Sequence, residues 1–122
     1  RRHFDLGFRD WPRFDLMLMG LGADGHTASI FPGTRAASDL SNMVLVYPVP
    51  QLGVERMTLT LPVINNARHV LFLVTGEDKA EALYAVLHGE YRPSTYPAQA
   101  VKPTDGTLTW LVDTAAASLL PR

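Results

Sequence analysis

The sequence predicts an α/β fold with a mostly parallel sheet and helices on both faces. Two observations support this prediction. Short apolar runs alternate along the 122 residues with segments of helical pattern, which is the order that βα units produce. The apolar runs also lack an alternating polar face, as expected for strands that are buried on both sides. A chain of this length forms one modest core, here of the doubly wound, Rossmann-like kind.

The first half of the chain contains three predicted strands. The apolar run 14–21 predicts a buried strand that ends in a glycine-rich segment. The run 43–49 predicts a second strand, and Pro48 places it at an edge or an end of the sheet. Residues 57–61 alternate at period two and predict a third strand. A short helix follows over 63–67, because the proline before it suits a first helical turn.

The second half repeats the alternation. The run 69–74 predicts a buried strand, and 77–88 is the clearest helix, with apolar residues at helical spacing and a glycine at its end. The segment 91–103 holds three prolines and predicts a loop with one helical turn. A last strand is expected at 107–112, and a final helix over 114–120, capped by an aspartate.

Composition argues against several classes of function. The formal net charge is −1, which provides no basic field for nucleic acid. The chain has no cysteine, which excludes disulfides and thiolate chemistry and is compatible with a reducing compartment. No apolar run approaches the ~20 residues of a membrane span, and no signal peptide is recognised. We expect a cytoplasmic protein that contacts neither nucleic acid nor membrane.

The most informative segment follows the first strand. Residues 20–33 read GLGADGHTASIFPG, and their glycines allow a sharp turn at the carboxyl end of a strand, where open α/β sheets bind ligands. His26 is a candidate general base, because an imidazole titrates near neutrality. Asp24 could hold its tautomer or balance its charge. The alternative is structural, with Asp24 in an Asx turn and His26 capping the next turn.

The glycine spacing also matches the dinucleotide fingerprint G-x-G-x-x-G. That fingerprint needs a long helix, whereas Pro32 and Gly33 end any helix soon after it begins. Asp24 would also place a carboxylate beside the phosphates. One Asp-x-His pair is too few ligands for a metal site. We therefore expect neither a nucleotide cofactor nor a metal.

Two cations are candidates for binding an anionic substrate. Residues 76–79, Gly-Glu-Asp-Lys, repeat the strand–glycine–helix arrangement, where free N–H groups and the helix dipole favour an anion. Lys79 could meet a phosphate there or point into solvent. Arg56 could bind a phosphate bidentately or pair with Glu55 at the surface. The residues alone leave these alternatives open.

Residues 20–33 resemble the signature of the 6-phosphogluconolactonase family, which belongs with glucosamine-6-phosphate deaminase in one sugar-phosphate superfamily. Further resemblances follow at 56–60 (RMTLT), 76–80 (GEDKA), 97–98 (PA) and 110–113 (WLVD), so the similarity covers nearly the whole chain from residue 14.

The resemblance implies hydrolysis of 6-phospho-D-glucono-1,5-lactone to 6-phosphogluconate in the oxidative pentose phosphate pathway, without a metal or an organic cofactor. His26 would activate the water, with Asp24 as its neighbour. The implied substrate-binding residues, including backbone donors of the turn and ligands of the 6-phosphate, are Gly22, Gly25, Arg56 and Lys79. The deaminase carries a catalytic glutamate where this chain has Phe31, which cannot exchange protons and so favours the lactonase.

Family members are considerably longer. Their N-terminal half resembles a βα unit with a Gly/Ser-rich phosphate loop and a Gly-Asp-Glu-Arg segment, and neither occurs here. We therefore expect residues 1–122 to be a single α/β domain that forms the C-terminal part of a longer lactonase domain, and to hydrolyse the lactone poorly when alone. The contrasting hypothesis is a non-catalytic sugar-phosphate-binding module or an inactive fragment. The oligomeric state is left open.

Overall fold

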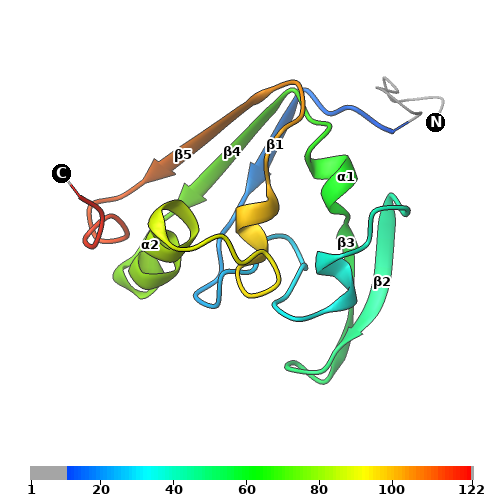
Figure 1. Ribbon diagram of the computed structural model, residues 1–122, viewed down its shortest axis with the longest axis horizontal. Helices are drawn as coiled ribbons and strands as arrows, with labels where there is room; N and C mark the ends of the chain where they lie inside the picture. The colour runs from blue at the N-terminus through cyan, green and yellow to red at the C-terminus, as the bar shows by residue number, and fades with distance from the viewer. Residues whose placement is uncertain (1–10, 122) are drawn as a thin grey trace.

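A three-stranded parallel sheet forms the centre of the molecule. The computed structural model describes residues 11–121 (Figure 1). The sheet has the order β1-β4-β5, with β1 at Leu16–Met19, β4 at His69–Val74 and β5 at Thr107–Val112. Both pairings are parallel, so the carboxyl ends of all three strands lie at the same edge. The predicted mostly parallel sheet is confirmed.

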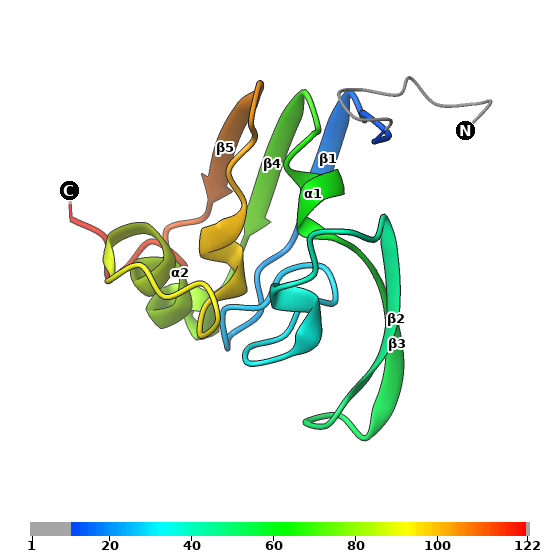
Figure 2. The ribbon, with the colours of Figure 1, turned by 45° about the vertical axis from the view of Figure 1, so that its right-hand side comes forward.

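The other two strands form a separate antiparallel hairpin, β2 at Val44–Val49 and β3 at Val54–Leu59. The sequence placed these runs within the alternating βα pattern, which is wrong. A four-residue connection containing Gly53, with φ 66°, turns the chain back before a crossover helix can form. Every second residue of β2 is buried, as in a strand covered on one side. Figure 2 shows the hairpin standing beside the β1 edge of the sheet.

The helices are short. They comprise α1 at Leu61–Ile64, α2 at Ala80–His88 and 3-10 turns at Arg35–Ala37 (η2), Glu77–Lys79 (η3) and Pro97–Ala100 (η4). The predicted helix 63–67 begins two residues earlier, because Pro62 already lies in the first turn. The predicted helix 77–88 opens as the 3-10 turn η3 before α2. The helical turn expected within 91–103 is confirmed as η4.

The predicted helix at 114–120 is wrong. Residues 114–119 form consecutive turns, in which Ser118 N–H bonds to Ala115 and Leu120 N–H to Ala117. The Asp113 side chain does accept a hydrogen bond from Ala116 N–H at 2.8 Å, as a cap would. The cap therefore starts a turn that does not propagate into a helix.

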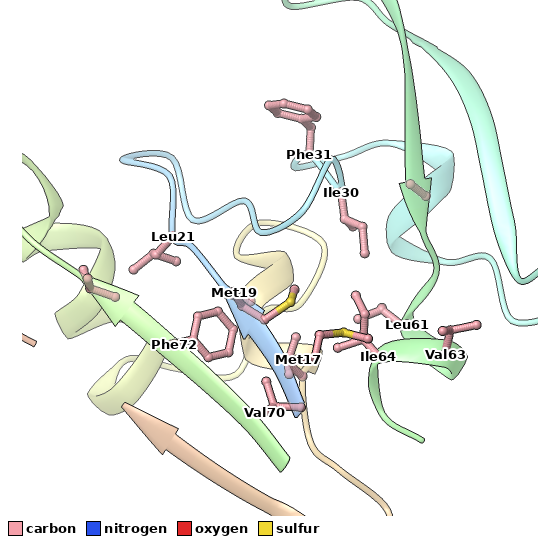
Figure 3. Close-up of a cluster of buried hydrophobic side chains, with 14 of the residues drawn as sticks. Met17, Met19, Leu21, Ile30, Phe31, Leu61, Val63, Ile64, Val70 and Phe72 are labelled. Atoms are coloured by element: carbon pink, nitrogen blue, oxygen red, sulfur yellow. The ribbon is translucent and has the colours of Figure 1, made fainter. Parts of the chain in front are cut away.

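One face of the sheet carries the core. Met17 and Met19 of β1 and Val70 and Phe72 of β4 are buried, and Figure 3 shows them beside Ile64 of α1. Side chains on the opposite face of the sheet are exposed, including Leu16 and Leu18 of β1, Leu73 of β4 and Leu111 of β5. The expectation of strands buried on both sides is therefore not met within residues 11–121. No helix in this described part is long and apolar enough to cross a membrane.

Candidate active site

Two glycine-containing segments meet at the carboxyl edge of the sheet. Residues 20–33, the β1 loop, follow β1, and residues 75–79, the β4 turn, follow β4. Because β1 and β4 are adjacent and parallel, the segments emerge side by side. Lys79 joins them, since its Nζ donates a hydrogen bond to the Leu21 carbonyl at 2.9 Å. The alternative in which Lys79 points into solvent is therefore wrong.

Asp24 and His26 are in direct contact. The His26 ring Nδ1 lies 2.5 Å from Asp24 Oδ1, which also accepts the His26 backbone N–H at 3.1 Å. Partial burial raises the pKa of Asp24, but the hydrogen bonds from the His26 ring and backbone outweigh it, so the pKa lies below its ordinary value. Asp24 is thus ionised at neutral pH and can only accept. The His26 Nδ1 that contacts this carboxylate therefore carries a proton, and Nε2 is left without a contact to Asp24.

Gly22 makes room for the His26 ring. A Cβ at this position would lie 2.0 Å from the ring Nδ1, closer than any packing allows. Gly22 N–H donates to the His26 carbonyl at 2.8 Å, and Gly25 N–H donates to the Gly22 carbonyl at 3.0 Å. These bonds close the turn, but with the Asp24–His26 bond they occupy the amides of Gly22, Gly25 and His26. These three N–H groups are therefore already paired within the turn.

The segment around η4 holds the β1 loop from outside. Gly25 has φ 88°, and a Cβ there would meet the Tyr96 ring at 2.7 Å. The Gly25 carbonyl accepts Ala98 N–H at 3.1 Å, and Gly33 N–H donates to the Ser94 carbonyl at 2.7 Å. Sequence reasoning missed Tyr96, whose only signal was its place in the proline-rich segment. Gly22 and Gly25 thus serve close packing, and their contact with substrate remains a prediction.

The hairpin holds the β1 loop from the other side. The buried Tyr47 hydroxyl donates to the Ser29 carbonyl at 2.6 Å, and Ser29 N–H donates to the Thr58 hydroxyl at 3.1 Å. Tyr47 was also missed, because an isolated tyrosine in an apolar strand is no signal in sequence. Both contacts require the antiparallel pairing of β2 with β3.

Arg56 lies on the loop-facing side of this hairpin. It pairs in register with Tyr47 and lies two residues before Thr58, so all three side chains share one face of the hairpin. Glu55 is its neighbour in sequence and points to the opposite face. Within residues 11–121 the Arg56 side chain is exposed and makes no ion pair, so the predicted alternative of a surface pair with Glu55 does not form. The structure does not bring Arg56 into contact with His26 or Lys79 in this part of the chain.

The β4 turn differs from its expected form. Gly76 has φ 99°, and its N–H donates to both carboxylate oxygens of Asp113 at 3.2 Å. The Gly76 amide is therefore not one of the free N–H groups of this turn. Lys79 N–H bonds to the Gly76 carbonyl at 3.2 Å, which closes the 3-10 turn. The ammonium group of Lys79 is thus the element of this turn that reaches the β1 loop.

A cavity of about 290 Å³ adjoins the site, between the end of β1 and the hairpin. Its lining includes Met19, Gly20, Ser29 and Thr58 but not His26. Among the described residues no three His, Asp or Glu side chains converge as a metal centre would require. The described site therefore contains an imidazole, a carboxylate bonded to it and the ammonium group of Lys79, while Arg56 lies on the hairpin without contact to them.

Comparison with protein families decides the affiliation of the chain. The family model described as glucosamine-6-phosphate isomerases/6-phosphogluconolactonase matches residues 1–110. The chain belongs to this family.

Members of the family resemble the chain in sequence and in structure. The probable 6-phosphogluconolactonase 2 of Oryza sativa subsp. indica is 44% identical over 117 residues, which are 91% of this chain and 41% of that protein. The crystal structure of devB protein superposes with a TM-score of 0.88 at 33% identity, over 98% of this chain and 50% of that one. For the 6-phosphogluconolactonase from Trypanosoma brucei the TM-score is 0.77 at 35% identity, over 90% and 43%. The chain thus spans about two fifths of the length of the curated relatives it matches.

Proposed function

We propose that the Asp24–His26 pair catalyses hydrolysis of 6-phospho-D-glucono-1,5-lactone to 6-phosphogluconate. One observation carries the proposal: the His26 Nδ1 lies 2.5 Å from the Asp24 carboxylate, which leaves Nε2 as the free base. Family members that are similar to this chain are named 6-phosphogluconolactonase, and these names support the proposed reaction. The buried Phe31 argues against deamination, because the position of the deaminase glutamate holds a side chain without a proton to exchange.

The proposed reaction needs one water and no cofactor. His26 Nε2 takes a proton from the water as its oxygen bonds to the lactone carbonyl carbon, and Asp24 stabilises the imidazolium that forms. The tetrahedral intermediate then collapses, the ester bond to the ring oxygen breaks, and the imidazolium returns its proton to that oxygen. The product is an open-chain acid with a free hydroxyl, and His26 is neutral again.

Lys79 and Arg56 are proposed to hold the 6-phosphate. Lys79 is supported by its bond to Leu21, which leaves the ammonium group two further donors beside the β1 loop. Arg56 is supported by its exposed guanidinium on the loop-facing side of the hairpin. A phosphate between the two would anchor the substrate away from the carbonyl carbon and so orient it toward His26.

The test compares two histidine variants of the chain. His26→Asn is expected to lower the enzymatic rate by about 10²–10⁴-fold while 6-phosphogluconate binding persists, because the variant loses only the proton acceptor. His69→Asn is the matched control, since His69 opens β4 at the opposite edge of the sheet and bonds to Thr107. Lactone opening is measured against the spontaneous rate. Binding without any catalysed opening, unchanged by His26→Asn, would select a non-catalytic binding module instead.

We also propose that these residues are the C-terminal part of a longer lactonase domain and work in the cytoplasm. The exposed leucines of the sheet, among them Leu16, Leu18 and Leu73, support a longer domain, because parallel sheets are normally covered on both faces. The lack of cysteine is compatible with the location. The chain alone is then expected to turn over more slowly than a full-length relative, and equal kcat/KM values would contradict this.

A further inference from the structure

Phe31 is the one aromatic side chain that stacks on His26 in the described structure. The two ring centroids lie 4.3 Å apart, with 25° between the ring planes. Phe31 is 5% exposed and belongs to the core cluster, whereas the His26 ring lies at the border between that core and solvent. Figure 3 shows Phe31 on the β1 loop next to Ile30. A buried ring thus lies flat against a half-exposed imidazole.

The backbone of Phe31 is fixed on both sides. Its N–H donates to the Tyr47 hydroxyl at 3.3 Å, and its carbonyl accepts the Thr34 hydroxyl at 2.7 Å. Tyr47 in turn donates to the Ser29 carbonyl and is 3% exposed. Tyr47 of the hairpin and Thr34 thus hold the backbone of Phe31, and the burial of its ring in the core cluster leaves that ring little room to follow a rotation of the His26 ring.

The hydrogen bond to Asp24 by itself would still allow the His26 imidazole to rotate about that bond. Torsions between a tetrahedral carbon and a flat ring are broad, so a single hydrogen bond at Nδ1 permits the ring plane to swing about it. A fixed ring stacked on one face removes that freedom, because rotation would bring the two rings into collision.

We infer that Phe31 is a positioning residue, which holds the His26 imidazole in the orientation that keeps Nδ1 on Asp24 and Nε2 open to a substrate. The inference concerns the same site as the proposed lactone hydrolysis, and its catalytic consequence rests on that function. Phe31 takes no part in proton transfer. It acts through His26, and through the hairpin that holds its own backbone.

Nuclear magnetic resonance tests the stack without reference to activity. In the wild-type chain the His26 ring protons should be shifted upfield by the Phe31 ring, and the ¹⁵N shifts should show a protonated Nδ1 and an unprotonated Nε2. Phe31→Leu should lose the upfield shift and bring the two nitrogen shifts closer together, whereas Phe31→Tyr should retain the wild-type pattern. Phe72→Leu is the control, because Phe72 stacks on Trp110 in the core with centroids 4.0 Å apart. It should leave the His26 signals unchanged.

Kinetics supplies the second readout. Phe31→Leu is expected to lower kcat by about tenfold to a hundredfold with little change in KM, because a misoriented base affects the chemical step more than binding. Unchanged nitrogen shifts and kcat in Phe31→Leu would overturn the inference, even if His26→Asn still abolishes hydrolysis. If Phe31→Leu does not fold, the absence of an upfield His26 shift in the wild type overturns it equally. An intact stack in a chain without hydrolysis would instead contradict only the proposed function.

Discussion

The β1 loop and the β4 turn follow neighbouring parallel strands, yet they are built differently. The β1 loop is held from two sides, by Tyr47 of the hairpin and by Ala98 of η4, and its own hydrogen bonds close it around Gly22. The β4 turn is bonded to Asp113 through the Gly76 amide, and Lys79 connects it to the β1 loop. Proton transfer by a titratable pair requires a fixed orientation of both side chains. A cation that binds a phosphate requires mainly a side chain long enough to contact it. The difference in restraint therefore matches the difference in proposed roles.

The largest effect is expected from a substitution that disturbs the fixed geometry of the β1 loop. Gly22→Ala places a Cβ 2.0 Å from the His26 ring and should displace the imidazole from Asp24, lowering the hydrolysis rate by about a hundredfold or more. Gly20→Ala in the same loop is the matched control, because a Cβ there meets nothing within 4 Å. The measurement is kcat together with the His26 ¹⁵N shifts. Equal losses in the two variants would show that the space at Gly22 is irrelevant.

The next effect concerns the β4 turn alone. Lys79→Met should weaken 6-phosphogluconate binding and raise KM by about tenfold to a hundredfold, because a charge-assisted contact is lost, while kcat changes less. Lys102→Met is the control, since Lys102 is the other lysine of the chain and lies over the Tyr91 ring. Calorimetric titration with 6-phosphogluconate measures the binding. A fall in kcat at unchanged KM would assign Lys79 to the chemical step. The β1 loop and the β4 turn would then not differ in role as proposed.

The smallest effect is a dependence of stability on pH. The folded-state pKa of Asp24 lies below its ordinary value of 3.8, so its carboxylate stabilises the fold above that value. This contribution is lost as the pH falls through the lowered pKa. The melting temperature of Asp24→Asn should therefore lie slightly below that of the wild type at pH 5 and above, and the two should converge in stronger acid. A difference that grows on acidification would contradict the sign.

Sequence spacing predicted the parts of the site that are local. Asp24 and His26 are two residues apart in a glycine-rich turn, so their contact could be anticipated before any fold was known. Tyr47 and Tyr96 could not, because each reaches the β1 loop only through the pairing of distant segments. The partner of the Gly76 amide could not be anticipated either, because its acceptor, Asp113, lies 37 residues away in the sequence.

The sequence by itself determined the three parallel strands, the glycine-rich turn after the first of them and the Asp24–His26 pair within it, because apolar runs and short spacings encode local geometry. Only the tertiary structure decided that the runs at 44–49 and 54–59 form a hairpin, that Lys79 turns toward Leu21 and that Phe31 lies against His26. It also decided which face of the sheet is buried, since alternate side chains of β1 are equally apolar and differ only in what covers them. Local pattern specifies an element, whereas the partner of that element depends on contacts between residues far apart in the chain.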